Sequence, residues 1–352
     1  MMKKAKVAVL GATGMVGQQY LKLLQNHPMF TVSTLTGDKS VGKRYGDAVN
    51  WIVSENIPNE FVDMEVQPTK PSKVDADLVF SPLPSEVAGR AEEQFAKSGF
   101  PVMSDASAHR MEPDVPLLIA EVNLGHLSVI DEQKRSRKWD GFIVTSPNCT
   151  TVGLALVLKP LADKFGVNQV IVSTMQALSG AGFPGVPALA IHDNVIPYIE
   201  NEEEKVETEV SKILGSQNKK RIAPSEIAIS ASCHRVATID GHFESIYLTT
   251  EKDTVIKSVT ETLRTFSSIP QQMKLPTAPT QPIIVRDEAD RPQPRLDRYA
   301  GSVPGMSAVV GRIRHGLDSK SLKFGIMVHN TIRGAAGGTI LIAEYIVEKG
   351  MV

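Results

Sequence analysis

Cysteine is scarce in this sequence, because only Cys149 and Cys233 occur among its 352 residues. Two thiols cannot build the disulfide framework of a small secreted protein, and so few cysteines suit a reducing cytoplasm. An excess of either charge is also missing, since 38 Lys and Arg oppose 39 Asp and Glu and leave a net charge of -1. Neither a nucleic-acid partner nor a membrane surface is therefore expected.

Long apolar runs are absent as well. No stretch reaches the length of about 18 apolar residues that a membrane-spanning helix needs. The charged start followed by an apolar run resembles a signal peptide, but the run is short and ends at Gly11, so a buried strand is expected there. The composition, 42% hydrophobic and 22% charged, is that of a globular protein. The length predicts about two domains.

The first part of the chain alternates short apolar runs with helical patterns. Strands are expected at 6–10, 30–35, 77–81, 100–104 and 141–145. Helices are expected at 15–26 and 86–98. This alternation predicts a Rossmann-like, doubly wound α/β fold, and residues 1–148 are expected to form a dinucleotide-binding domain.

The middle of the chain has a different pattern. Alternating strands are expected at 170–176, 226–232 and 243–251, and helices at 150–165, 205–214 and 254–266. An α+β catalytic domain with an antiparallel sheet is therefore predicted for residues 149–329. The proline-rich segment 275–305 is expected to be irregular, and 330–349 is expected to be a helix. We expect the C-terminal segment 330–352 to complete the first domain.

Three glycines, Gly11, Gly14 and Gly17, lie between the first predicted strand and helix in the segment GATGMVG. Glycines let the backbone approach a pyrophosphate, and the helix N-terminus offers free N–H groups with a partial positive charge. The spacing GxxGxxG differs by one residue from the dinucleotide fingerprint GxGxxG. A tight turn without a ligand is the alternative, but the strand and helix on either side favour a dinucleotide site.

The loop after the second predicted strand bears on the choice of dinucleotide. Asp38 has the spacing of the acidic residue that NAD sites use to hold the ribose. Lys39, Ser40, Lys43 and Arg44 crowd the same loop and suit a ribose 2′-phosphate. A solvated basic loop is the alternative, and NADP is the expected cofactor.

Cys149 follows a predicted strand and opens a predicted helix, in the segment SPNCTT. A helix N-terminus stabilises an anion and so favours the thiolate, and Asn148 can donate to a developing oxyanion. The alternative is a buried structural thiol, which is the usual state of a free cysteine. Cys233 lies in an alternating strand pattern, where a core role is favoured. Cys149 is therefore the expected nucleophile.

A thiol nucleophile needs a proton-transfer partner, and the sequence contains eight histidines. His27 and His126 lie in predicted turns and His192 on a helical stretch, so surface positions are expected for all three. His242 follows Gly241 at the entrance to a strand, where the glycine allows close approach. His242 is the candidate, with a structural turn histidine as the alternative.

Seven segments spread in order along nearly the whole chain together resemble aspartate-semialdehyde dehydrogenases, most of all those of the archaeal and fungal branch. They are GATGMVG, SDASAHRMEPDVPLLIAEVN, SPNCTT, MQALSGAG, NEEEK, SCHRVATIDGH and HNTIRGAAGG. The resemblance implies a second domain of the glyceraldehyde-3-phosphate dehydrogenase-like type and a homodimer or homotetramer. It also implies reduction of L-aspartyl-4-phosphate by NADPH to L-aspartate 4-semialdehyde and phosphate, a step towards lysine, threonine and methionine. No cluster has metal-ligand spacing, and no metal is expected.

The resemblance also implies roles for individual residues. Cys149 would be the nucleophile and His242 the general acid/base, while Gln176 would position the acyl intermediate. Arg235 would hold the substrate α-carboxylate through its planar fork. The other substrate contacts would be Glu202 or Glu203 on the amino group, and Lys205, Arg110 and Asn148 on the phosphate. The cofactor contacts would be Gly11, Thr13, Gly14, Met15, Val16, Gly17, Lys39, Ser40, Ser81, Ser179, Gly180, Gly182 and Asn330.

Malonyl-CoA reductase is the nearest alternative, because it would use the same cysteine and histidine on a very similar scaffold. Two positions depart from the aspartate-semialdehyde dehydrogenase pattern and leave room for malonyl-CoA reductase. They are Cys233-His234, where asparagine is commoner before the arginine, and Ala237-Thr238 after it. The NEEEK segment favours an amino-acid substrate. N-acetyl-glutamyl-phosphate reductase and glyceraldehyde-3-phosphate dehydrogenase share the mechanism but match less well. A catalytically inactive, NADP-binding redox sensor is the alternative of another class, and it predicts cofactor binding without turnover.

Overall fold

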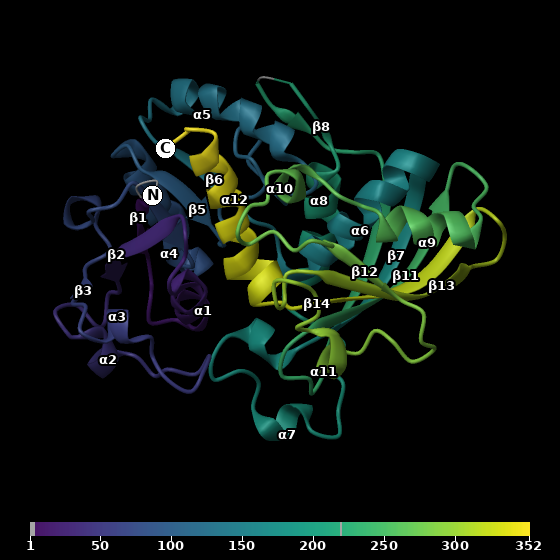
Figure 1. Cartoon of the computed structure of the whole chain (residues 1–352), viewed down its shortest axis with the longest axis horizontal. Helices are drawn as coiled ribbons and strands as arrows, with labels where there is room; N and C mark the ends of the chain where they lie inside the picture. Colours follow the sequence, from purple (N-terminus) through teal and green to yellow (C-terminus); the bar gives the residue numbers. More distant parts are fainter. Residues whose placement is uncertain (1–3, 219) are drawn as a thin grey trace.

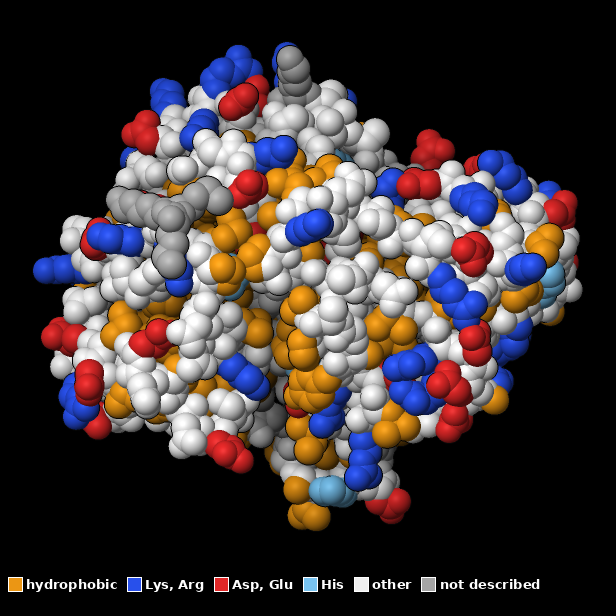
Figure 2. All heavy atoms as spheres, viewed as in Figure 1, with side chains coloured by type: hydrophobic (Ala, Val, Ile, Leu, Met, Phe, Trp, Pro, Cys, Tyr) orange, Lys and Arg blue, Asp and Glu red, His pale blue; other side chains and the backbone are white. Residues whose placement is uncertain are grey.

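The computed structural model describes residues 4–218 and 220–352. It contains two six-stranded sheets, one in each half of the molecule (Figure 1). Lysine, arginine, aspartate and glutamate side chains are interspersed over the face in Figure 2, as the net charge of -1 leads one to expect. No helix among the described residues is both long enough and apolar enough to cross a membrane.

The first sheet is entirely parallel and has the strand order β3-β2-β1-β4-β5-β6. Its strands are β1 (Ala5–Val9), β2 (Phe30–Thr36), β3 (Val66–Gln67), β4 (Leu78–Ser81), β5 (Pro101–Ser104) and β6 (Phe142–Thr145). The helices of this half are α1 (Met15–Leu24), α2 (Tyr45–Ala48), α3 (Asn59–Val62), α4 (Ser85–Lys97) and α5 (Ile130–Arg137). The doubly wound prediction is confirmed. The strand order reverses between β1 and β4, and ligands of such sheets bind at the carboxyl ends beside this point.

The second sheet has the order β10-β7-β11-β14-β13-β12. Its strands are β7 (Val167–Gln176), β10 (Ala228–Arg235), β11 (His242–Thr250), β12 (Ile283–Arg286), β13 (Ala308–His315) and β14 (Ser321–Val328). The prediction of an antiparallel sheet is wrong at both edges, because β10 runs parallel to β7 and β12 runs parallel to β13. The connection from β7 to β10 passes through a helix, and a crossover of this kind joins parallel strands.

One face of the second sheet is covered by three helices, α6 (Cys149–Phe165), α8 (Glu202–Ile213) and α9 (Ile256–Arg264). Helix α6 is buried on nearly every side, as expected for a helix that is apolar all round. The short elements of this half are α7 (Ala188–Ile191), α10 (Ile269–Gln272), α11 (Pro294–Asp297) and the hairpin of β8 (Ser216–Gln217) and β9 (Ile222–Ala223). The segment 275–305, predicted to be irregular, therefore contains one strand and one short helix.

The C-terminal helix is shorter than predicted. A π-helical turn at Ile332–Ala336 comes first, Ala335 breaks the helical backbone there, and α12 runs from Gly337 to Glu348. Ile340 and Ile346 of α12 share a core with Val7 and Val9 of β1. The last helix of the chain therefore packs against the first sheet.

Two of the three histidines expected at the surface are buried instead. His27 Nε2 lies 2.9 Å from Glu344 Oε1, and His126 Nε2 lies 3.2 Å from the Gly215 carbonyl. Only His192 is exposed, because the other two fill polar gaps between elements that are far apart in the sequence.

Candidate active site

A cavity of about 1020 Å³ lies at the carboxyl ends of the first sheet and opens between the two sheets. It is lined by loops that follow β1, β2, β4, β5 and β6 and by the ends of β7 and β10 from the other half. All three residues predicted to be catalytic meet here: Cys149 and Gln176 line the cavity, and His242 contacts Cys149 from behind.

The glycine loop forms one wall. Gly11, Thr13, Gly14, Met15 and Val16 line the cavity, where α1 begins without an acidic residue in its first turn. The loop therefore offers backbone N–H groups and a partial positive charge to an anion.

Gly17 does not line the cavity, contrary to the prediction. A Cβ there would lie 2.5 Å from the Gly11 carbonyl oxygen and 2.8 Å from Ala12 Cα. Gly17 is therefore needed for the close packing of α1 against its own loop.

The loop after β2 places Asp38, Lys39 and Ser40 on the cavity. Arg44, which counted in favour of NADP, pairs with Asp63 instead, and Lys43 is exposed outside the cavity. The cationic group available here is therefore Lys39.

Ser81, a predicted cofactor contact, is buried at the end of β4. Its hydroxyl donates to Glu92 Oε1 at 2.6 Å, on the side of α4. Successive side chains of a strand point to opposite faces, and Ser81 points into the core.

Cys149 is the first residue of α6, and Asn148 is its N-cap. Asn148 Oδ1 accepts hydrogen bonds from the backbone N–H groups of Thr150 (2.9 Å) and Thr151 (3.3 Å). Asn148 Nδ2 donates to Glu202 Oε1 at 2.9 Å. The cap holds the half-buried thiol at the positive end of α6, on the cavity surface.

His242 is the first residue of β11, and its Nε2 lies 3.2 Å from Cys149 Sγ. Its Nδ1 accepts a hydrogen bond from the backbone N–H of Ala177 at 3.0 Å. Because a backbone N–H can only donate, Nδ1 carries no proton in this arrangement. The proton of the neutral imidazole is therefore on Nε2 and points at the sulfur.

Burial keeps both members of this pair uncharged. Burial, followed by the nearby Glu202 carboxylate, raises the pKa of the Cys149 thiol to about 12, although Arg235 and Arg110 oppose the increase. Burial, followed by the charge of Arg235, lowers the pKa of His242 to about 3. At neutral pH the resting pair is a thiol beside an imidazole that donates from Nε2.

The ends of β7 and β10 bring two more predicted residues to the cavity. Gln176 Nε2 donates to Thr174 Oγ1 at 3.3 Å, and Arg235 Nη1 donates to the Ala177 carbonyl at 2.7 Å. Burial lowers the pKa of Arg235, while the neighbouring Cys149 and Glu202 oppose the decrease. Ser179, Gly180, Gly182 and Asn330 line the same side of the cavity, with Asn330 Nδ2 donating to Ser179 Oγ at 2.8 Å.

Helix α8 separates the two acidic candidates. Glu202 and Lys205 line the cavity, whereas Glu203 accepts a hydrogen bond from the backbone N–H of Cys233 at 2.9 Å. Consecutive residues of a helix point about 100° apart, so Glu203 faces β10 and cannot share the role of Glu202.

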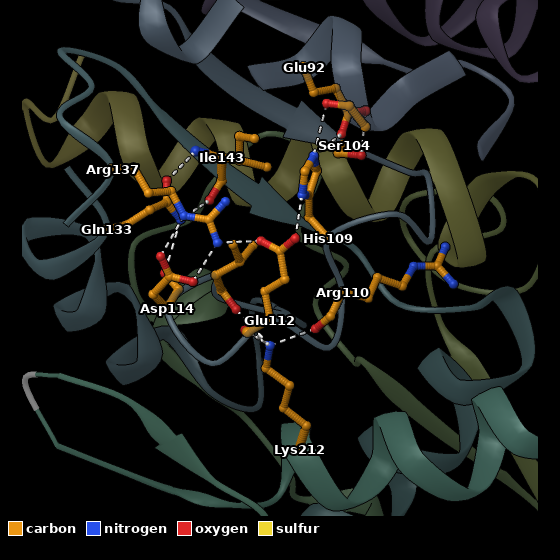
Figure 3. Close-up of polar contacts among 12 residues, drawn as sticks. Glu92, Ser104, His109, Arg110, Glu112, Asp114, Gln133, Arg137, Ile143 and Lys212 are labelled. Carbon is orange, nitrogen blue, oxygen red and sulfur yellow. Dashed lines mark hydrogen bonds and ion pairs between the residues drawn. The ribbon is translucent and has the colours of Figure 1, made fainter. Parts of the chain in front are cut away.

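Arg110 reaches the cavity from the loop after β5. Its Nη2 donates to the Asp105 carbonyl at 2.6 Å, and its Nη1 donates to Glu209 Oε1 at 2.9 Å. Figure 3 shows the guanidinium pointing away from a polar cluster that holds the rest of the loop. In that cluster Lys212 Nζ donates to three backbone carbonyls, and Arg137 pairs with Glu112 and Asp114.

Some cavity residues were not predicted from the sequence, among them Asp105, Thr331 and Gly334. A Cβ on Gly334 would lie 2.8 Å from Cys149 Cβ and 2.9 Å from Cys149 Cα. The small-residue run Gly334 to Gly338 was the available signal, because such a run permits close approach of another backbone.

Comparisons with known proteins agree with this geometry. The family model for the semialdehyde dehydrogenase NAD binding domain matches residues 6–130, and that for the semialdehyde dehydrogenase dimerisation domain matches residues 158–333. An aspartate-semialdehyde dehydrogenase from Archaeoglobus fulgidus is 52% identical, over 98% of this chain and 99% of its own length. A malonyl CoA reductase (NADP) from Metallosphaera sedula is 46% identical, over 100% of this chain and 99% of its own. The crystal structure of aspartate semialdehyde dehydrogenase with NADP from Candida albicans has a TM-score of 0.90 and 40% identity, with 99% of this chain and 100% of that chain covered.

The fold and the site define a two-domain, dinucleotide-dependent dehydrogenase with a thiol and an imidazole paired at the cleft. The chain belongs to the aspartate-semialdehyde dehydrogenase family, in the branch that includes archaeal and fungal members. The match to a dimerisation domain indicates that the protein is a homo-oligomer.

Proposed function

We propose that this protein reduces L-aspartyl-4-phosphate to L-aspartate 4-semialdehyde and phosphate with NADPH, through a thioester on Cys149. The observation that carries the proposal is the 3.2 Å contact between Cys149 Sγ and His242 Nε2, at a helix N-terminus that opens on a dinucleotide-type cavity. The family relationship supports the same reaction.

The residues present fit a phosphorylated dinucleotide. The loop of Gly11 to Val16 would hold the pyrophosphate, and Lys39 with Ser40 would hold the 2′-phosphate. Ser179, Gly180, Gly182 and Asn330 would face the nicotinamide half. When bound, NADPH supplies the hydride that reduces the thioester.

Three side chains would orient the aspartyl group. Arg235 presents its guanidinium to the α-carboxylate, and Glu202 presents its carboxylate to the amino group. Gln176, buried at the end of β7, would hold the acyl group near the sulfur. Arg110 and Lys205 reach the cavity as the cationic groups for the phosphate.

In the first half-reaction the Cys149 sulfur attacks the acyl carbon and the bond to the phosphate oxygen breaks. The thiol proton ends on the released phosphate, which Arg110 and Lys205 stabilise. His242 donates from Nε2 to the sulfur while negative charge develops there, which is the proton position that Ala177 imposes.

In the second half-reaction the reduced thiohemiacetal collapses to the aldehyde and expels the Cys149 thiolate. His242 Nε2–H stabilises that thiolate by a hydrogen bond, and a proton from water restores the thiol, because the overall reduction consumes one proton. His242 therefore acts as a hydrogen-bond donor to the sulfur in both half-reactions, while its proton-accepting atom, Nδ1, is held by the Ala177 N–H.

Malonyl-CoA reductase is the second candidate, because a protein of that name is 46% identical over the whole chain. Its substrate has no α-amino group, so Glu202 would have no partner on it. The test is to supply aspartate semialdehyde, phosphate and NADP, and to follow NADPH absorbance. In a parallel reaction malonyl-CoA is supplied with NADPH. NADPH oxidation with malonyl-CoA and no signal with the aldehyde would refute the main proposal.

We further propose a homodimer or homotetramer that pairs through the uncovered face of the second sheet, in a cytoplasmic protein. The residues on this face include Ile171, Phe243, Tyr247, Arg312 and Lys323. Light scattering after size exclusion measures the mass. Ile171→Asp should shift the mass towards that of the monomer, and an unchanged mass would assign the interface elsewhere.

A further inference from the structure

Helix α8 carries a row of charged side chains with alternating sign: Glu202, Lys205, Glu209 and Lys212. The spacings of three, four and three residues place them on one face of the helix. Glu202 and Lys205 line the cavity, whereas Glu209 and Lys212 are buried beneath it at 2% and 3% exposure. Glu209 and Lys212 lie too deep to contact a substrate, yet both are hydrogen-bonded to residues of the cavity wall.

Glu209 links two parts of the site with one carboxylate. Its Oε1 accepts from Arg110 Nη1 at 2.9 Å, and its Oε2 accepts from the backbone N–H of Asn148 at 2.6 Å. Asn148 directly precedes Cys149 and caps α6. The two oxygens of Glu209 therefore set the position of the Arg110 guanidinium relative to the nucleophile.

Arg110 depends on this contact for its orientation. Its Nη2 is bonded to the Asp105 carbonyl, and its Nε is buried without a partner among the described residues. A guanidinium held by a single carbonyl can rotate about that bond, whereas two anchors fix its plane. Loss of the Glu209 contact would thus leave Arg110 in place but misoriented.

Lys212 holds the backbone of the same loop. Its Nζ donates to the carbonyls of Arg110 (2.5 Å) and Glu112 (2.7 Å), both labelled in Figure 3, and to that of Val115 (2.8 Å). One side chain binds three carbonyls of an irregular segment, and it is the donor recorded for those of Arg110 and Val115, whereas the Glu112 carbonyl also accepts from the Val115 N–H. The deep half of α8 therefore fixes both the backbone and the guanidinium of Arg110.

We propose that Glu209 is a positioning residue for the phosphate subsite, acting through Arg110, with Lys212 supporting the loop that carries it. The identity of the anion rests on the proposed function, whereas the positioning of Arg110 rests on the contacts alone. Glu209 touches neither substrate nor cofactor, so its substitution should weaken the binding of phosphate and leave the binding of the dinucleotide unchanged.

The test uses Glu209→Gln, which keeps the shape but places an amide N–H₂ against one of the two donors. In the direction that consumes aspartate semialdehyde, phosphate and NADP, KM for phosphate should rise about tenfold or more, because one charge-assisted hydrogen bond is lost. KM for NADP should stay within about twofold, since misoriented Arg110 lies outside the dinucleotide contacts. Glu207→Gln is the matched control, because Glu207 lies on the same helix and accepts the Ala231 N–H at 2.9 Å, away from the cavity.

A second readout is independent of turnover. Inorganic phosphate should slow alkylation of Cys149 by iodoacetamide, and Glu209→Gln should raise the half-protecting phosphate concentration by a similar factor. If phosphate protects the wild-type protein but the protein does not turn over the aldehyde, the proposed reaction is contradicted. The protection assay would still show whether Glu209 positions Arg110. The double variant Arg110→Gln/Glu209→Gln should need no more phosphate for half protection than Arg110→Gln alone, because both changes act through the Arg110 guanidinium.

Three results would overturn the proposal: an unchanged phosphate response in Glu209→Gln, an equal change in Glu207→Gln, or additive effects in the double variant. If Glu209→Gln does not fold, Glu209→Asp replaces it. That side chain keeps the charge but is one methylene too short to reach both partners, and the same selective rise in KM for phosphate is required of it.

Discussion

Cys149 and Cys233 are two free thiols with similarly raised pKa values, but they lie in regions that differ in secondary structure, exposure and hydrogen-bond partners. Burial raises the pKa of each thiol to about 12. Cys149 begins a helix and is half-buried on the cavity, whereas Cys233 lies two residues before the end of β10 and is fully buried in the second core. A histidine donates to the first sulfur, and Glu202 adds to the high pKa of both thiols, whereas Glu203 and Glu244 add only to that of Cys233.

The difference shows that the acidity of the resting thiol does not select the nucleophile here. What distinguishes Cys149 is access to a cavity, a donor at 3.2 Å and two arginines whose charge favours the thiolate. These features act when a substrate arrives, and a strand in a packed core offers none of them.

The largest expected effect separates the two cysteines directly. Cys149→Ala should abolish turnover, because no other described thiol reaches the cavity. Cys233→Ala should keep kcat within about twofold of wild type, since its side chain touches only the core. Steady-state rates in the phosphate-dependent reaction measure both. Turnover lost in Cys233→Ala and kept in Cys149→Ala would reverse the assignment.

The next effect concerns the histidine beside each cysteine. His242→Ala should lower kcat about 10²- to 10⁴-fold, the range for loss of a positioned acid or base. His234 is the matched control, because it follows Cys233 and its Nδ1 lies 3.1 Å from the Thr174 carbonyl, away from the cavity. His234→Ala should change kcat by less than about twofold. Equal losses in the two variants would show that His242 acts only through folding, and thermal unfolding of both should be measured alongside.

The region of Cys149 was more predictable from the sequence than the region of α8. A buried strand that ends in a glycine, and an asparagine before a cysteine at a helix start, are local patterns, and the first sheet and α6 follow from them. Strands β13 and β14 were missed, although both are eight residues long, because each is interrupted by a glycine.

The three glutamates of the NEEEK segment show what a local pattern leaves undecided. Which of them faces the cavity depends on the rotation of α8 about its axis, and this rotation is set by burial of Val206, Val210 and Ile213. Glu202 is directed to the site and Glu203 to β10 for that reason alone. Glu209 was not predicted because its partners, Arg110 and Asn148, are 99 and 61 residues away.

A third effect uses the raised pKa of both thiols. In the protein without ligands, the rate of Cys149 alkylation by iodoacetamide should rise about 100-fold between pH 7 and pH 9, because the thiolate fraction increases tenfold per pH unit below the pKa. Mass spectrometry of the modified peptides measures the rate. Cys233 should remain unmodified over the same time, since its sulfur is inaccessible. A plateau below pH 9 for Cys149 would mean that His242 and the arginines already hold a thiolate in the resting protein.

The smallest expected effect is on the free energy of unfolding, where substitution of Cys233 should cost more than substitution of Cys149. Cys233→Ala removes a fully buried sulfur from a packed core and should lower the free energy of unfolding by about 1 kcal/mol, as deletion of one buried heavy atom does. Cys149→Ala should change it by less than about 0.5 kcal/mol, because the sulfur borders a cavity and leaves no closed void. Urea unfolding of both variants at pH 7 measures the difference. If Cys149→Ala proved the more destabilising of the two, the His242 contact would have to be counted as part of the fold as well as of the site.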